Sequence, residues 1–288
     1  MSLGYAAPLY ALSCDQRAPL IETLLGVGGP LDRASRAQLM AVKAALYAGF
    51  RRAGAVTGTH RAGLVVVDPE WGLDIYRHAS AHGSLTAVTL DPIDGDAAEL
   101  EPAAAVRALD EVPAPFAKVR FGVALGPRFE RALAQLSRLM PAVRARARRL
   151  AVELRGDWRF ALHAMQRLQD AGVEADVWIL DPLEGEALAL AAAIARRDGR
   201  DGVCCLVQLG GDDMSARRDA QAAARAPGFI GFGVDPALMH GDVQAWRAGW
   251  VTWDGLVAHV AARYCALIDL FAPRDRFLAA PLTLQAHG

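Results

Sequence analysis

The sequence predicts a single (β/α)₈ barrel that spans residues 1–288 as one domain. Its 288 residues suit one large α/β barrel. Eight apolar runs of strand length alternate with longer stretches of helical periodicity. The runs are nearly continuous, as in parallel strands covered by helices. No linker and no break in composition divides the chain, which favours one closed barrel over two domains.

The order of the expected elements follows the chain. The eight expected strands are the apolar runs at 8–14, 63–67, 84–89, 116–123, 149–154, 175–180, 203–209 and 229–234. The clearest helical patterns lie at 36–53, 72–82, 128–148, 158–171, 185–197 and 215–225, and a longer helix is expected at 256–271. Segment 92–113 contains only a short helical stretch.

Glycine and proline support this order. Gly172 and Gly228 fall where helices should end before the next strand, and Pro127 and Pro236 suit first helical turns. An open, doubly wound sheet is the alternative arrangement. However, no GxGxxG follows the first apolar run and no GxxxxGK[ST] occurs, which argues against the nucleotide-binding versions of that fold.

Composition narrows the class of protein. The net charge of −1 gives no electrostatic attraction to nucleic acid or acidic membranes. The N-terminus lacks a signal-peptide pattern, and the longest apolar run, 187–195, is too short to span a bilayer. The four cysteines lack CxxC spacing, as expected of reduced thiols. We therefore expect a cytoplasmic protein that acts on a small-molecule substrate without a cofactor. The sequence does not decide between a monomer and a homo-oligomer.

Polar residues lie inside or just after the apolar runs, towards the ends where barrels place their chemistry. They are Asp15, Gln16, Arg17, Asp68, Asp91, Lys118, Arg120, Glu153, Arg155, Asp181, Asp212, Asp213 and Asp235, and Gly211 directly precedes Asp212. A ring of carboxylates suits acid–base chemistry or a hard metal ion. Aspartate before a helix is equally typical of an N-cap, so both interpretations stay open for most of these positions.

Lys118 and Glu153 lie inside apolar runs, where a charge is costly unless it is paired or used. They are either catalytic groups or a structural ion pair between adjacent strands. The other lysine of the chain, Lys43, lies on an amphipathic helix, where it is expected to be solvated or to snorkel, with its amine in solvent. His78 and His82 have metal-binding spacing, but on a helix outside the barrel. Trp178 is expected in the core.

Several segments match a known family. They are SCDQR at 13–17, VDPEWG at 67–72, AKV at 117–119, VEL at 152–154, LQDAGVEADVW at 168–178 and GFIGFGV at 228–234. On these segments the chain resembles the bacterial class I aldolase barrels that include tagatose 1,6-bisphosphate aldolase. It resembles more closely the aldolase-like domain fused to 5-dehydro-2-deoxygluconokinase of inositol catabolism, which is related to 2-deoxy-5-keto-gluconate 6-phosphate aldolase.

The chain departs from this family at the reacting position. The family's strand-six DVWK lysine, which forms a Schiff base with the substrate ketone, corresponds to Ile179 here, and an isoleucine cannot form an imine. The family's phosphate-binding GR pair corresponds to Val234 and Asp235, and an aspartate repels phosphate. The resemblance implies that Asp15, Gln16, Arg17, Asp68, Lys118 and Glu153 are the retained groups.

Three hypotheses follow. The first is a diverged carbon–carbon lyase acting on a small sugar or sugar acid. In it Lys118 is the amine or an electrostatic anchor, Glu153 moves protons, and Asp15 belongs to the catalytic set. Gln16, Arg17, Asp68, Asp181, Gly211 and Asp235 are the expected substrate-binding positions.

The second hypothesis is a catalytically inactive barrel that binds a metabolite or a partner protein, since the nucleophile position is lost. The third is a metal-assisted lyase or isomerase in which a divalent ion binds carboxylates. Its expected ligands are Asp15, Asp68, Glu153, Asp181 and Asp235.

Overall fold

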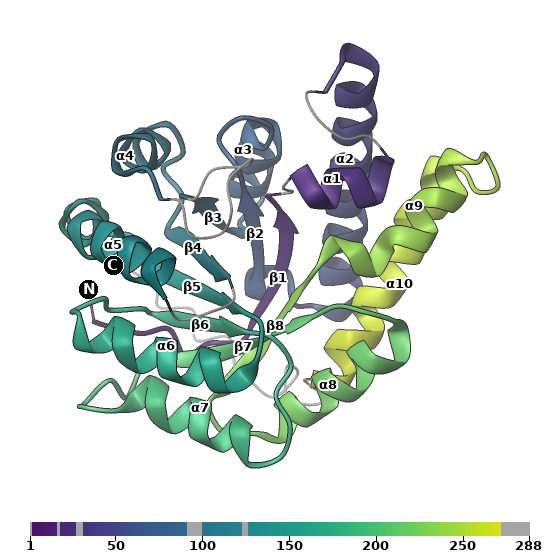
Figure 1. The fold of residues 1–288 in the computed structure, drawn as a ribbon. Helices are drawn as coiled ribbons and strands as arrows, with labels where there is room; N and C mark the ends of the chain where they lie inside the picture. The colour runs from purple at the N-terminus through teal and green to yellow at the C-terminus, as the bar shows by residue number, and fades with distance from the viewer. Residues whose placement is uncertain (1, 16–17, 27–30, 91–99, 123–125, 272–288) are drawn as a thin grey trace, which may run out of the picture.

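The computed structural model describes residues 2–15, 18–26, 31–90, 100–122 and 126–271. Eight parallel strands form one closed barrel in chain order, and the last strand pairs with the first. Helices surround the strands (Figure 1). The predicted (β/α)₈ fold is therefore confirmed.

The strands are β1 (Leu9–Cys14), β2 (Gly63–Val67), β3 (Leu85–Thr89), β4 (Phe116–Gly122), β5 (Arg149–Arg155), β6 (Val177–Leu180), β7 (Cys204–Leu209) and β8 (Phe229–Val234). The helices are α1 (Ala18–Leu25), α2 (Arg33–Thr57), α3 (Leu73–Ala81), α4 (Pro102–Glu111), α5 (Pro127–Ala145), α6 (Trp158–Asp170), α7 (Glu186–Arg196), α8 (Asp213–Arg225), α9 (His240–Arg247) and α10 (Trp253–Phe271). Two 3₁₀ turns lie at His60–Ala62 and Pro236–Met239.

Helix ends differ from the expected bounds where local hydrogen bonds decide them. Helix α2 begins three residues early because Asp32 accepts a hydrogen bond from the Ser35 amide at 2.7 Å. Helix α8 begins two residues early because Asp212 caps it through the Ser215 amide. Helix α5 ends before Ala147, whose φ of 52° is left-handed. Pro236 opens a 3₁₀ turn instead of an α-helix.

The short helices α1 and α9 were not expected from periodicity. Each has eight residues, too few for an isolated helix to be stable in water. Contact between the two helices stabilises them instead. The Gln244 side-chain amide of α9 donates a hydrogen bond to the Leu24 carbonyl of α1 at 2.8 Å. Of segment 92–113, residues 92–99 lie outside the described residues, and α4 accounts for the helical stretch.

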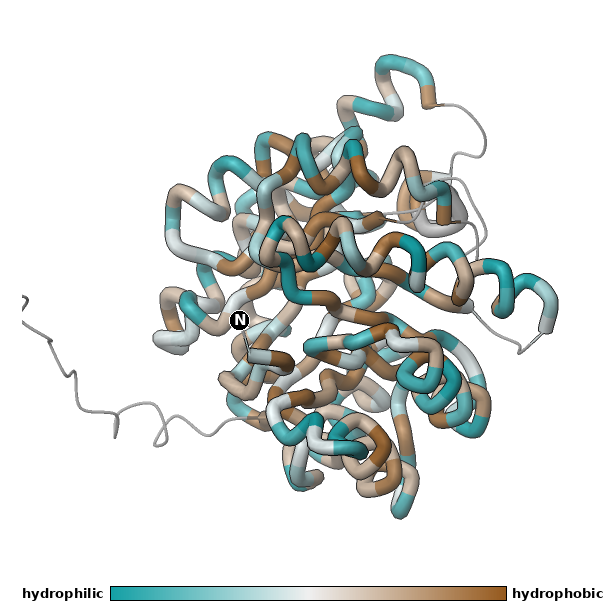
Figure 2. Tube along the Cα trace, turned by 90° about the vertical axis from the view of Figure 1, so that its left-hand side faces the viewer, coloured by the Kyte–Doolittle hydropathy of each residue, from teal (hydrophilic) through white to brown (hydrophobic). Residues whose placement is uncertain are grey.

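Apolar side chains fill the interior of the barrel. Successive residues of a strand alternate between the inside of a barrel and its helical cover. The interior cluster contains Leu9, Ala11, Leu64, Val66, Ala87, Phe116, Ala151, Val177, Ile179 and Leu206. The alternate residues pack under the helices, and Trp178 lies there fully buried, as expected. Viewed from the side, hydrophilic residues recur along the outer helices (Figure 2).

Helices α2 and α10 lie against each other beside the closure between β1 and β8 (Figure 1). Their close approach depends on Gly49, where a Cβ atom would lie 2.6 Å from Val260. Across the described residues, no helix combines the length and apolar character that a membrane crossing requires.

Candidate active site at the mouth of the barrel

The centre of the site is Lys118 on β4. Its Nζ lies 2.6 Å from Glu153 Oε2 and 2.8 Å from Asp15 Oδ2. Asp15 directly follows β1 and Glu153 lies on β5, and the contact between Lys118 and Asp15 joins residues 103 positions apart in the sequence. The three side chains expected to be catalytic therefore share one environment.

Strand register explains this convergence. Lys118 pairs with Ala151, and Arg120 pairs with Glu153, so Lys118 lies one level below Glu153 on the same face. Phe116 and Ala151 of the apolar cluster lie beneath them. The Lys118 and Glu153 side chains are only 3% exposed, a burial that charged groups tolerate only when they are paired.

A second level of charges extends the site. Arg155 on β5 lies 3.4 Å from Glu153, 3.0 Å from Asp181 and 3.2 Å from Asp235. Arg120 on β4 comes no closer than 3.9 Å to Glu153. The expected substrate-binding residues Asp181 and Asp235 therefore meet at one arginine, on the side of the mouth formed by β5, β6 and β8.

The surroundings shift two carboxyl groups in opposite directions. Burial disfavours the charged form of Glu153, but attraction to Lys118, Arg120 and Arg155 outweighs it, so the pKa of Glu153 is lowered. Burial dominates at Asp181, whose pKa is raised despite Arg155 and the Gly156 amide. Glu153 is therefore a carboxylate at neutral pH.

Asp68 and Lys43 correct one expectation. Lys43 is only 1% exposed and its Nζ lies 2.7 Å from Asp68 Oδ2, so its expected place in solvent is wrong. The helix that carries Lys43 packs so close to the barrel that the amine reaches the end of β2. The other Asp68 oxygen accepts from the Trp71 amide at 2.6 Å. Both Asp68 oxygens thus stabilise the turn after β2.

The capping interpretation also holds at several strand ends. Asp235 accepts from the Ala237 amide while it contacts Arg155, and Asp212 caps α8. Asp181 is not a helix cap, because it accepts from the Gly156 amide after β5. Gly211 is exposed with a left-handed φ of 73°, between β7 and α8. Gln16, Arg17 and Asp91 lie outside the described residues.

Sequence reasoning left three polar residues out of the site. Arg120 and Arg155 each follow a predicted catalytic residue by two positions, a spacing that puts both side chains on one strand face. Gln208 on β7 lies over Gly233 of β8, where a Cβ atom would be 2.2 Å from Gln208 Oε1. The i, i+2 spacing on β4 and β5 is the signal that could have found the two arginines.

The carboxylates expected as metal ligands contact cations instead. Asp15 and Glu153 contact Lys118, Asp68 contacts Lys43, and Asp181 and Asp235 contact Arg155. Among the described residues, no three His, Cys, Asp or Glu side chains gather as a metal site. His78 and His82 stack at 4.0 Å on α3, and His78 Nδ1 lies 2.9 Å from the Tyr47 hydroxyl.

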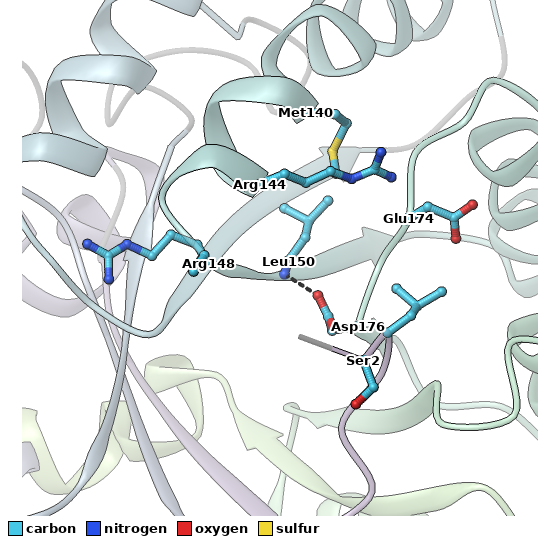
Figure 3. Close-up of a pocket in the computed structure, with 9 residues that line it drawn as sticks. Ser2, Met140, Arg144, Arg148, Leu150, Glu174 and Asp176 are labelled. Atoms are coloured by element: carbon cyan, nitrogen blue, oxygen red, sulfur yellow. Dashed lines mark hydrogen bonds between the residues drawn. The ribbon is translucent and has the colours of Figure 1, made fainter.

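A cavity of about 390 Å³ lies at the opposite end of the barrel (Figure 3). Its lining includes Met140 and Arg144 of α5, Leu150 near the start of β5, and Asp176 just before β6. Asp176 accepts from the Leu150 and Gly4 amides, so it fastens the N-terminal segment to the barrel. Barrel chemistry occurs at the carboxyl ends of strands, so this cavity is not part of the mouth.

The fold and the charged cluster define a (β/α)₈ barrel with a lysine–carboxylate centre at its mouth. The chain belongs to the family described as "Uncharacterized protein conserved in bacteria (DUF2090)", whose model matches residues 5–275. No curated protein matches the sequence.

Solved structures support the fold. The YdjI aldolase of Escherichia coli K12 is 10% identical over 94% of this chain and 93% of that one, with a TM-score of 0.56. Active domain 2 of a chitinase from Pyrococcus furiosus is 10% identical over 94% and 98%, with a TM-score of 0.51. Since an aldolase and a chitinase fit comparably at such low identity, the likeness concerns the fold alone.

Proposed function

We propose that the protein is a diverged class I aldolase-like carbon–carbon lyase of cytoplasmic carbohydrate metabolism, with a small sugar or sugar acid as its substrate. The observation that carries this proposal is the position of the Lys118 amine, 2.6 Å from Glu153 and 2.8 Å from Asp15 at the mouth of the barrel. The family resemblance set out from the sequence supports the reaction type.

The position of Ile179 is consistent with a relocated amine. Ile179 on β6 is the strand partner of Glu153 on β5, and it belongs to the apolar cluster of the barrel. Lys118 reaches the same glutamate from β4, on the other side of β5. A lysine on β4 can therefore bring an amine to the part of the mouth where the related aldolases use a lysine on β6.

The chemistry then assigns a role to each group. Lys118 first transfers a proton to a neighbouring carboxylate, because an ammonium is not a nucleophile. The free amine adds to the substrate ketone, and the protonated carboxyl returns its proton to the carbinolamine hydroxyl, which leaves as water. The iminium then accepts the electron pair of the breaking carbon–carbon bond while Glu153 removes the proton of the β-hydroxyl. Asp15 holds the amine in place throughout.

Turnover measurements test this proposal. Wild-type protein is assayed for cleavage and condensation over a panel of ketoses, sugar acids and 2-oxo acids with aldehydes. We expect K118M to abolish turnover and E153Q to lower kcat by about 10²–10⁴-fold. R217Q, which changes an exposed arginine on α8, should match wild type. Turnover that survives in K118M would refute the assignment of Lys118.

A non-catalytic metabolite-binding barrel is the second candidate. It is favoured by the ion pairs that Lys118 forms with both Glu153 and Asp15, an arrangement that also suits a structural charge cluster. In that case a member of the panel would raise the melting temperature of wild-type protein, while no product would form with any pair of substrates.

A further inference from the structure

Two arginines at the mouth differ in how they are paired. Arg155 has three carboxylates within 3.4 Å, so its charge is already balanced by the protein. Arg120 has one carboxylate at 3.9 Å, and its buried Nε has no acceptor in the described part of the chain. An arginine guanidinium offers five donors in a fixed fork, and among the described residues the Nε donor of Arg120 is unused.

Arg120 is also more accessible than the Lys118–Glu153 pair. Its side chain is 23% exposed, whereas Glu153 and Lys118 are 3% exposed. Register places Arg120, Glu153 and Ile179 in one row across β4, β5 and β6. A ligand that enters the mouth thus meets the Arg120 guanidinium above the Lys118 amine.

We propose that Arg120 is the substrate's anion receptor and that it selects a 2-oxo acid, a molecule whose carboxylate is bonded directly to the reacting carbonyl. This inference rests on the proposed function, because it takes Lys118 as the amine that meets the carbonyl. Guanidinium and carboxylate match in shape and form paired, charge-assisted hydrogen bonds.

The spacing of the two cations carries the choice of a 2-oxo acid. Arg120 and Lys118 approach the two oxygens of a single carboxylate, Oε1 and Oε2 of Glu153. Positive groups so close together suit an anion and a carbonyl on adjacent carbon atoms. A phosphorylated ketone has further atoms between the two groups.

The opposite side of the mouth disfavours a second anion. Asp181 and Asp235 both form ion pairs with Arg155 there, so the carboxylates outnumber the arginine that they contact. The far end of the substrate is therefore expected to be uncharged and hydroxylated, since carboxylates accept hydrogen bonds from hydroxyl groups and repel phosphate. The substrate class is a 2-oxo acid with a polyol chain.

Calorimetric binding tests this inference with pyruvate, dihydroxyacetone and dihydroxyacetone phosphate as probes. We expect wild type to bind pyruvate at least about tenfold more tightly than either of the other two, since charge-assisted bonds to a preplaced arginine are strong. R120Q should weaken pyruvate binding by about 10- to 100-fold and change dihydroxyacetone binding by less than about twofold. R217Q is the matched control on an exposed helix.

R120K separates charge from shape, since it keeps the cation near Glu153 and removes the planar fork. It should bind pyruvate with an affinity between those of wild type and R120Q. Absence of pyruvate binding in wild type, or equal binding in R120Q, would overturn the inference. If pyruvate binds through Arg120 while no substrate pair turns over, the lyase proposal fails and the anion receptor stands.

Discussion

At the scale of single residues, the site depends on buried charges that compensate one another. Lys118 lies between Glu153 and Asp15, and Lys43 pairs with Asp68 at the neighbouring strand end. Both lysines are almost fully buried. Loss of one partner from such a group leaves an uncompensated charge in the interior, which costs more than the pair itself contributes.

This asymmetry predicts the stability of Lys118 variants. K118M should lower the free energy of unfolding by about 3–5 kcal/mol, because it leaves two carboxylates without their common cation. K118M/E153Q should lose less than the sum of the two single variants, because it removes charges of both signs. Urea unfolding followed by circular dichroism measures all three. Strict additivity would show that the two groups do not interact.

The lowered pKa of Glu153 predicts a dependence on pH. A carboxyl group whose pKa is lower in the folded state stabilises the fold above the unfolded pKa of about 4.3, and that contribution is lost as the pH falls towards the folded value. The stability advantage of wild type over E153Q should therefore shrink as the pH falls below the unfolded pKa of about 4.3. The raised pKa of Asp181 acts in the opposite direction, and burial, its main cause, is common to both proteins.

Urea unfolding at several pH values measures this difference. A constant difference between wild type and E153Q across the range would contradict the lowered pKa. D110N provides a comparison, because the exposed Asp110–Arg146 pair lies far from the mouth, on α4 and the end of α5.

The sequence identified the charged residues at the mouth of the barrel better than it identified their ion-pair partners. Lys118 and Glu153 stood out because each interrupts an apolar run, and Asp15 because it follows the first strand. Lys43 did not stand out, because the apolar periodicity of a helix does not distinguish a lysine in solvent from a lysine whose amine is buried at a strand end. Arg120 and Arg155 looked like ordinary polar residues until the barrel placed them above Lys118 and Glu153.

At the scale of elements, contact between α2 and α10 depends on a small residue. Gly49 lies where a methyl group would be 2.6 Å from Val260 and 2.9 Å from the Val257 carbonyl oxygen. Alanine normally favours a helix over glycine, so any loss of stability at this position measures the packing. The two helices support the junction where the last strand meets the first.

G49A should lower the free energy of unfolding by about 1–3 kcal/mol, the usual cost of an overpacked core. Removal of the opposing methyl groups should relieve part of the collision, so G49A/V260A should lose less than the sum of its single variants. G241A is the matched control in α9, since no atom of the described residues outside the adjoining helix backbone lies within 4 Å of the new methyl group. It should be neutral or stabilising by up to about 1 kcal/mol. A destabilised G241A with an unaffected G49A would contradict the packing model.

Element positions were predictable and their ends less so. Each strand core follows from an apolar run, because burial on both faces leaves little choice of residue. Helix ends depend on individual hydrogen bonds, as at Asp32 and Asp212, and on left-handed residues such as Ala147. Helices α1 and α9 depend on their contact with each other, which no local pattern records.

At the scale of the whole molecule, closure of the barrel makes the site possible. Asp15 follows β1, whereas Asp235 follows β8, and only the pairing of these two strands completes the ring of charges. The chain should therefore unfold as one domain. Tryptophan fluorescence and circular dichroism should give coincident urea transitions with a single midpoint. Two separated transitions would show that part of the barrel unfolds independently.

The most direct test of the Lys118 site is borohydride trapping with a ketone substrate, because reduction converts an imine into a stable amine. The chain has two lysines, and a modified Lys118 resists trypsin, so its peptide should continue to Arg120. Incubation with pyruvate or dihydroxyacetone should give one adduct per chain at Lys118, and K118M should give none. An adduct on Lys43 or the N-terminal amine alone, or no adduct with any ketone that the protein cleaves, would contradict the imine mechanism.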